Sequence, residues 1–393
     1  MDWKPGWVLP NIEIDKAIDT EYFALAPTSD PRVKKLKKQH PEFREFIGSF
    51  RDSFKNRLRP AVILTRDDAP KRLKTVDAVG GFRDILAAST VPKANAENTI
   101  YDGGRDRIGY SSAFSVYPWA LTTNLDHIVA LTPAFLGVHE ARAFQGQSSP
   151  ELPPVRASRR DFDFPLFRAL QERWLGRFNA ASPAWSDIAL FRSLNMANQA
   201  MMIPGGTDAT IHHFGRTISF WVSAFEILVH PGGDGRANLN KVFELLENAP
   251  WIEKRCRHRL YETGTKNKKA RRNLACWLYR ELNNRRNDFL HGNPVTRASL
   301  RVPYSGRGLI YVAPVLYRLG LTSFLGLSWN REVPAPENAD QFAQYITEHS
   351  EFHSPQKDAE RALLMARISV DEARRQRRQR IEETRRRRRK HQQ

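Results

Sequence analysis

A mainly α-helical protein is predicted, with a mixed α+β N-terminal region, an antiparallel helical bundle and a basic helical tail. Beyond residue 160, apolar residues recur at spacings of three and four, which is typical of amphipathic helices. Short aromatic and β-rich runs occur within the first 150 residues and indicate strands. The chain is 41% hydrophobic with 22 Phe and 9 Trp, so it has enough apolar surface for a core.

A length of 393 residues predicts two or three domains. The segment 145–157 contains three Pro and has the clearest linker composition in the chain. We therefore predict an N-terminal α+β region of unassigned role at 1–150 and a helical bundle at 158–330. A C-terminal segment at 331–393 ends in an Arg-rich tail.

In the N-terminal region, Phe, Ile and Leu at helical spacing predict a helix at 41–58, which Pro60 ends. A short helix is predicted at 81–88. Short strands or extended loops are predicted at 110–121 and 127–132.

The second half predicts six helices followed by a long C-terminal one. Gly292 is expected to end the fifth helix, because glycine is favoured just after a helix C-terminus. The last helix begins with Leu and Ile and is expected to fray into a solvated tail. The predicted ranges are 167–178, 185–202, 209–230, 239–247, 269–291, 309–319 and 357–390.

Charge and cysteine content exclude several protein classes. Lys and Arg number 62 against 43 Asp and Glu, a net charge of +19 that indicates a polyanionic partner. Only Cys256 and Cys276 are present, which argues against a disulfide scaffold and a Cys-rich zinc module. No signal peptide or membrane-spanning run is recognised, so we expect a cytoplasmic protein without a membrane partner.

The predicted helix 269–291 carries two different rows of side chains. Leu274, Leu278 and Leu282 step by four and should pack into the bundle. Arg286 continues this row and therefore needs a partner or a cleft. The neighbouring row is polar and consists of Tyr279, Asn283, Asn287 and His291. Such a row is also typical of a solvated face, and a terminal His can simply cap a helix.

Positive charge is dense just before and within this helix. Twelve Lys or Arg lie between 254 and 286, against Glu262 and Glu281. Basic clusters of this kind bind phosphate backbones, although a solvated loop at 266–272 is the alternative. The candidate RNA-binding residues are Lys254, Arg255, Arg257, Arg259, Lys268, Lys269, Arg271, Arg272 and Arg285.

The string ELNNRRNDFLHGNPV resembles the end of the signature helix of HEPN domains. In that motif an Arg precedes a polar residue, and a His follows after four to six residues. Arg286, Asn287 and His291 match it. The upstream string TISFWVSAFEILV, which contains Glu226, resembles a helix of the Apea-like HEPN branch. The resemblance covers about 160–330.

The resemblance implies a metal-independent RNA endonuclease with no cofactor. His291 would move protons while the RNA 2′-hydroxyl attacks the phosphate, and Arg286 would stabilise the developing charge. Asn287 would orient either group, with Glu226, Tyr279 and Asn283 in support. For Glu226, a buried acid paired with a core Arg for stability is the alternative.

The same resemblance implies a homodimer through the helix that bears Arg286. Positions five apart on a helix differ by roughly 140° in azimuth, so Arg286 and His291 do not share a face. HEPN domains bring two such helices together around one cleft. The expected products carry a 2′,3′-cyclic phosphate and a 5′-hydroxyl.

Three hypotheses follow for the whole chain. The first is a dimeric ribonuclease that acts as a toxin-like or antiviral defence effector. The second is a catalytically silent HEPN module that binds RNA or a protein partner. The third is a DNA-associated protein that uses its Arg-rich tail, for which deletion of 371–393 should abolish nucleic-acid binding.

Overall fold

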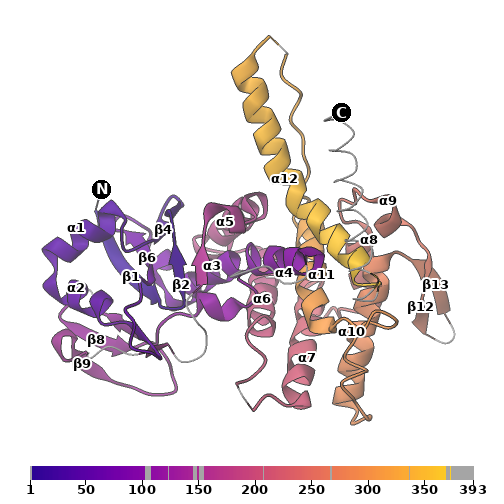
Figure 1. The fold of residues 1–393 in the computed structure, drawn as a ribbon, viewed down its shortest axis with the longest axis horizontal. Coiled ribbons are helices and arrows are strands. Elements are labelled where there is room, and N and C mark those ends of the chain that lie inside the picture. The colour runs from indigo at the N-terminus through magenta and orange to yellow at the C-terminus, as the bar shows by residue number, and fades with distance from the viewer. Residues whose placement is uncertain are drawn as a thin grey trace, which may run out of the picture. The chain divides into compact units, whose positions relative to one another are not determined.

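The computed structural model describes residues 2–101, 108–122, 124–144, 148–149, 155–206, 208–265, 268–335, 337–368 and 372 (Figure 1). Sheets lie in the N-terminal part and helices dominate the C-terminal half, which confirms the predicted mixture of an α+β region and a helical region.

The chain forms two compact units. The first comprises Met1–Ala94 and Arg105–Gly206, and the second comprises Asn95–Gly104 and Thr207–Gln393. The division near Gly206 differs from the boundary that the Pro-rich segment 145–157 indicated. The reason is that α5 (Phe164–Phe178) and α6 (Trp185–Ala200) pack on α3 (Val76–Ala88) of the first unit and do not join the later helices.

A four-stranded antiparallel sheet organises the first unit. Its strand order is β1 (Trp3–Leu9), β6 (Ala61–Arg66), β4 (Phe23–Ala26) and β3 (Ile18–Asp19). β4 and the first four residues of β6, 61–64, are apolar and buried, because helices cover both faces of the sheet. The sequence interpretation assigned no strands here.

Different groups of helices cover the two faces of this sheet. On one face, α1 (Pro31–Gln39) and α2 (Pro41–Gly48) pack their apolar side chains against Val8, Val62 and Leu64. On the other face, the Phe23 ring lies 5.3 Å from Phe82 of α3 and 5.1 Å from Trp174 of α5, measured between ring centroids. The remaining elements of the unit are α6, the start of α4 (Val91–Tyr101), short strands and turns.

The predicted helix 41–58 is correct only in its first half. It ends at Gly48, and Arg51–Asp52 instead form β5, which pairs in parallel with β10 (Ser148–Ser149). The Asp52 carboxylate accepts the main-chain N–H groups of Phe54 and Asn56 and closes a turn. Phe54 is consequently 85% exposed, although its spacing placed it on the apolar face.

The predicted strands at 110–121 and 127–132 are present over shorter ranges. They form a three-stranded antiparallel sheet of β7 (Trp119–Leu121), β8 (His127–Ala130) and β9 (Val138–Glu140), preceded by a 3-10 turn at Ser111–Phe114. The predicted helix 81–88 begins earlier, at Val76. The other bounds are β2 (Ile12–Ile14) paired with β11 (Val155–Ala157), α4 (Val91–Tyr101), and 3-10 turns at Lys71–Lys74, Ala141–Ala143 and Arg159–Asp161.

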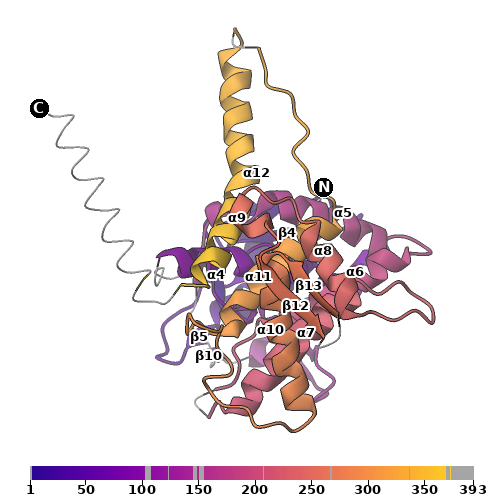
Figure 2. The ribbon, with the colours of Figure 1, turned by 90° about the vertical axis from the view of Figure 1, so that its right-hand side faces the viewer.

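The second unit is a helical bundle around α10 (Leu274–Leu290), as Figures 1 and 2 show. This helix contacts α7 (Ile211–Leu228), α8 (Leu239–Glu247) and α11 (Leu309–Phe324). Leu274, Leu278 and Leu282 are all 0% exposed, which confirms the prediction that their row is buried. The other elements are α9 (Lys254–Arg257), β12 (Tyr261–Thr265), β13 (Lys268–Arg272) and α12 (Ala339–Met365).

The start of α10 corrects the predicted range 269–291. Residues 268–272 pair with β12 as a hairpin, so the helix begins only after Asn273, whose side chain accepts the main-chain N–H of Cys276. At the other end the prediction is confirmed. Gly292 follows the helix with a φ of +70°, a conformation that glycine adopts without strain.

The C-terminal helix also differs from its predicted range. It starts at Ala339 instead of residue 357, and most of the predicted basic tail lies outside the described residues. Within the part of the chain that the structure describes, no helix combines the length and apolarity needed to cross a membrane.

Candidate functional site

Arg286 lies near the C-terminal end of α10 and meets an acid from a neighbouring helix. Its Nη2 is 3.6 Å from Oε2 of Glu226 on α7, and its Nη1 donates a hydrogen bond of 3.1 Å to Oδ1 of Asn287. The Arg286 side chain is 27% exposed, and its Nε is buried without a hydrogen-bond partner among the described residues. The structure therefore brings together three of the predicted site residues.

The Glu226 carboxyl group is only partly compensated by this contact. Burial raises its pKa above the usual value for a glutamate, and the charge of Arg286 opposes that shift. The ion pair is long, with Nη2 and Oε2 3.6 Å apart, so desolvation outweighs the attraction. Glu226 therefore holds Arg286 weakly, and another anion can bind the part of Arg286 that solvent reaches.

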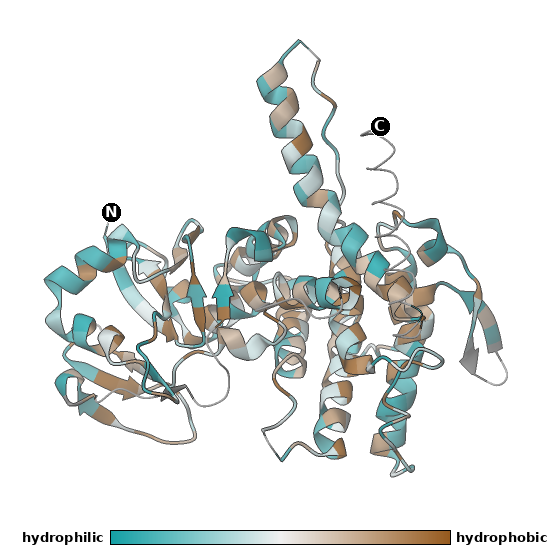
Figure 3. Ribbon diagram, in the orientation of Figure 1, coloured by the Kyte–Doolittle hydropathy of each residue, from teal (hydrophilic) through white to brown (hydrophobic). Residues whose placement is uncertain are grey.

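The polar row of α10 passes from buried to exposed along the helix. Tyr279 is 0% exposed, and its ring lies 4.9 Å from Phe225 on α7. Its hydroxyl has no hydrogen-bond partner in the described residues, and burial raises the pKa of that hydroxyl. Asn283 and Asn287 are half-buried, whereas His291 is exposed. In Figure 3, coloured by hydropathy, the ribbon of α10 is more hydrophobic at its start than along its middle.

His291 occupies the C-cap position of α10. Its main-chain N–H donates to the carbonyl oxygen of Asn287 at 2.9 Å, and its imidazole is exposed. No hydrogen bond joins this ring to Arg286 or Asn287 in the described part of the chain. Within one copy, His291 and Arg286 are therefore close in sequence, but their side chains are not linked by a hydrogen bond in the described part of the chain.

The predicted RNA-binding residues separate into two groups. Arg272 is half-buried over the Phe243 ring at 4.7 Å and pairs with Glu247 at 3.0 Å, and Arg285 pairs with Asp288 at 2.7 Å. These two are held within the fold. Lys268 lies in β13. The exposed members are Lys254, Arg255, Arg257, Arg259, Lys269 and Arg271.

Acids partly neutralise the basic stretch, and two of them, Glu247 and Glu253, lie outside it and were not counted with it. Glu253 pairs with Arg255 at 3.2 Å, and Glu247 pairs with Arg259 at 3.2 Å. Glu262 pairs with Lys269 at 2.7 Å. The charge excess counted along the sequence therefore overstates the positive charge that a ligand would meet here.

The other cysteines and histidines that could be reactive lie in surroundings that indicate a structural role. In the described residues, no three His, Cys, Asp or Glu side chains are grouped so as to hold a metal ion. Cys256 and Cys276 are buried free thiols, and burial raises the pKa of Cys256 to about 12, so its nucleophilic thiolate is suppressed. His213 accepts the main-chain N–H of Thr210 at 3.0 Å and belongs to a capping box.

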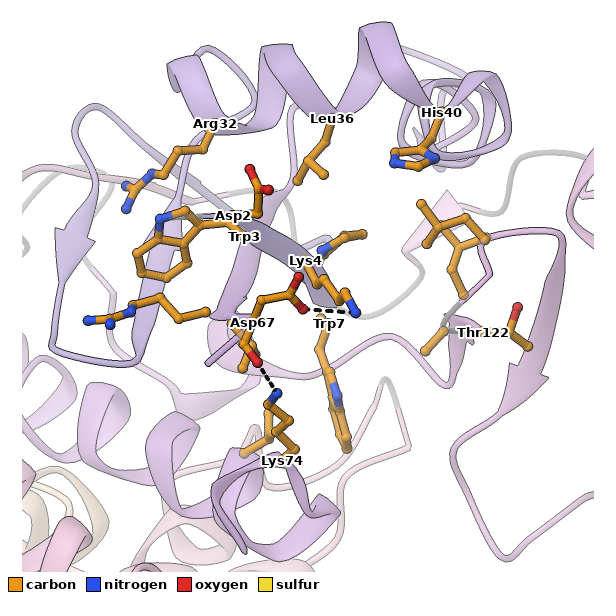
Figure 4. A pocket seen from close by; sticks show the side chains of 18 of the residues that line it. Asp2, Trp3, Lys4, Trp7, Arg32, Leu36, His40, Asp67, Lys74 and Thr122 are labelled. Carbon is orange, nitrogen blue, oxygen red and sulfur yellow. Dashed lines mark hydrogen bonds and ion pairs between the residues drawn. The ribbon is translucent and has the colours of Figure 1, made fainter. Parts of the chain in front are cut away.

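The first unit contains a cavity that the sequence interpretation missed (Figure 4). Its lining includes Trp3, Lys4, Gly6 and Trp7 of β1. The only sequence signal was the short run WKPGW near the N-terminus, in which two Trp flank a Lys. Its significance depends on residues far along the chain, which no local pattern reveals.

Comparison of the chain with protein-family models, with curated proteins and with solved structures finds no match.

Proposed function

We propose that the second unit is a metal-independent RNA endonuclease of HEPN type. The observation that best supports this is the end of α10, where a partly exposed guanidinium is held by Glu226 and an exposed imidazole follows five residues later. Arg286, Asn287 and His291 also fit the spacing of the HEPN motif. An RNA-cleaving toxin or an antiviral defence effector would use such a site.

The proposed reaction needs one cation and one proton carrier. His291 removes the proton from a 2′-hydroxyl or protonates the leaving 5′-oxygen, because imidazole titrates near neutral pH. Arg286 stabilises the extra negative charge on the phosphate through its N–H groups. Asn287 positions the guanidinium through the hydrogen bond to Nη1.

A second copy of the chain would complete this site. Arg286 and His291 project in directions that differ by roughly 140°, so one helix cannot present both to one phosphate. Leu290, next to His291, is 60% exposed and is an apolar side chain that a helix-to-helix contact would cover. We therefore expect a homodimer by light scattering at tens of micromolar protein. A fully active monomer would contradict this assembly.

The decisive experiment uses total RNA and tRNA with purified full-length protein in EDTA. Wild type should cut RNA and leave a 2′,3′-cyclic phosphate and a 5′-hydroxyl. His291→Ala should lower the rate by roughly 100- to 10,000-fold, while RNA affinity stays within about twofold. His258→Ala is the matched control, since His258 is an exposed histidine of the same unit. If the EDTA abolished cutting, or if His291→Ala cut as fast as wild type, the mechanism would be wrong.

A silent RNA-binding module is the second candidate. It is favoured by the contacts that Arg286 already makes with Glu226 and Asn287, which suit a structural role equally well. In that case wild type binds RNA with a strong salt dependence and leaves it intact under every metal condition. Charge reversal of the exposed Arg257 and Arg271 would then weaken binding, and the α10 variants would not.

A further inference from the structure

The cavity of the first unit has a volume of about 770 Å³. It lies around the edge strand β1 and is also lined by α1, by the end of β6 and by the β7–β8 sheet. This volume falls in the range of small-molecule sites, roughly 300–1,000 Å³. Five Lys or Arg line it, but three of them are paired with acids other than Asp67: Arg32 with Asp19 and Asp30, Lys35 with Asp2, and Arg66 with Asp68. The cations that matter for a ligand are therefore Lys4 and Lys74.

A β-bulge decides which side chains of β1 meet in this cavity. The pairing with β6 skips Gly6, since Pro5 opposes Leu64 and Trp7 opposes Ile63. The extra residue reverses the usual alternation and places Trp7 on the same face as Lys4. A side chain at position 6 would lie 2.7 Å from the Ile63 carbonyl oxygen, so glycine permits the bulge.

Two ammonium groups converge on one residue beside Trp7. Lys4 Nζ is 2.8 Å from Oδ1 of Asp67, and Lys74 Nζ donates to the main-chain oxygen of Asp67 at 2.7 Å. Figure 4 shows both lysines pointing at Asp67, with the Trp7 indole projecting from the same strand. Lys4 and Asp67 are 52% and 43% exposed, so their ion pair is weak and another anion can displace the carboxylate. Lys74 makes this contact with a main-chain oxygen and forms no ion pair among the described residues, although its charge lowers the pKa of the nearby Asp68 carboxyl group.

The cavity combines these cations with a flat apolar surface. Trp7 is half-buried, and α3, which covers the same face of the sheet, contributes Val76 and Val79 to the lining. An indole face stacks on any nucleobase, and ammonium groups bind phosphate as point charges. A purely apolar ligand would leave the lysines without a role, and a simple anion would leave Trp7 without one.

We propose that this cavity binds a nucleotide, with its base on the Trp7 indole and its phosphate between Lys4 and Lys74. The nucleotide is either free or the terminal residue of an RNA strand, since both present the same base and phosphate. This inference does not depend on RNA cleavage, because all of its residues belong to the first unit.

The test is calorimetric titration of the full-length protein with ADP. Trp7→Leu should weaken binding by about 10-fold or more, because a stacked base is lost while the site stays apolar. Trp185→Leu is the control, since Trp185 is 36% exposed and lies outside the cavity. Lys4→Gln with Lys74→Gln should weaken binding further and flatten its salt dependence, whereas Lys34→Gln on the exposed side of α1 should not.

Asp67→Asn should change the affinity for ADP in the opposite direction. Removal of the competing carboxylate should tighten ADP binding severalfold, an effect that disruption of the fold could not produce. A second arm uses an uncleavable 2′-O-methyl RNA strand with a 5′-phosphate or a 5′-hydroxyl. Binding of ADP supports a free nucleotide, and binding of the phosphorylated strand alone supports an RNA end. The proposal is overturned if neither ligand binds, or if Trp7→Leu and the lysine variants bind both as well as wild type.

Discussion

The two halves of α10 place similar polar side chains in opposite surroundings. Tyr279 belongs to the first half, where it is fully buried, has no hydrogen-bond partner among the described residues and has a raised pKa. Asn287 and His291 belong to the last turn and its cap, where Asn287 is half-buried and His291 is exposed. A polar row on a helix therefore gives no single prediction, because the depth of each residue decides whether it can meet a ligand.

The largest effect should come from the apolar row of the buried half. Leu278→Ala should lower the free energy of unfolding by about 2–5 kcal/mol, because it opens a cavity between α10 and its neighbours. Leu260→Ala, at a side chain that is 62% exposed, is the same change without burial and should cost less than about 0.5 kcal/mol. Urea denaturation of both variants measures the difference. Equal losses would mean that the row does not form the core of the bundle.

In the exposed half, the effect should appear in activity and not in stability. Arg286→Lys should lower RNA cleavage by about 100- to 1,000-fold, because a single ammonium cannot reproduce the two parallel N–H groups of arginine. Asn287→Ala should be milder, since that side chain only positions the guanidinium. Initial rates normalised to folded protein measure both. If Arg286→Lys cleaved RNA at nearly the wild-type rate, the site would need only a positive charge at this position and not the paired N–H groups of arginine.

The sequence was informative wherever a pattern was local and periodic. The bounds of α8 were predicted to the residue, and the end of α10 followed from Gly292. The Leu row was buried as its spacing required. These features depend on residues within one or two helical turns, so they are visible without any knowledge of the partners.

Features that depend on distant partners were missed. The strand Phe23–Ala26 and residues 61–64 of β6 are continuous apolar runs, which lack the alternation that identifies a half-exposed strand. Residues 269–272 were predicted as the start of the helix, but they form a strand of the hairpin before α10. A run of Lys and Arg has no alternation of apolar and polar residues that would indicate β pairing. The cavity needs Lys4 and Lys74 beside Trp7, and only the folded chain brings these residues together.

A smaller effect should appear at Glu226, and its sign depends on pH. Burial raises the pKa of Glu226 in the folded protein above its value in the unfolded chain, which is near 4.5. The neutral carboxyl group is therefore favoured by folding, and its contribution to stability is complete below pH 4.5. That contribution is lost as the pH rises through the pKa of the folded state. Glu226→Gln should therefore match wild type near pH 4 and exceed it in melting temperature near pH 8. Glu244→Gln at an exposed position of α8 is the control. A wild type more stable than Glu226→Gln near pH 8 would show that the contact with Arg286 outweighs desolvation.

The smallest effect should come from removing the hydroxyl of Tyr279. That group is buried and makes no hydrogen bond within the described residues, whereas its ring packs on Phe225 and Phe243. Tyr279→Phe keeps the ring and removes the cost of burying an unpaired hydroxyl, so the free energy of unfolding should stay equal or rise by less than about 1 kcal/mol. Tyr279→Ala, which also removes the ring, should cost about 3–5 kcal/mol by analogy with other large aromatic truncations. RNA cleavage by Tyr279→Phe should equal that of wild type. A stability loss above about 2 kcal/mol would reveal a hydrogen bond from this hydroxyl, and a loss of cleavage alone would restore Tyr279 to the supporting residues of the site.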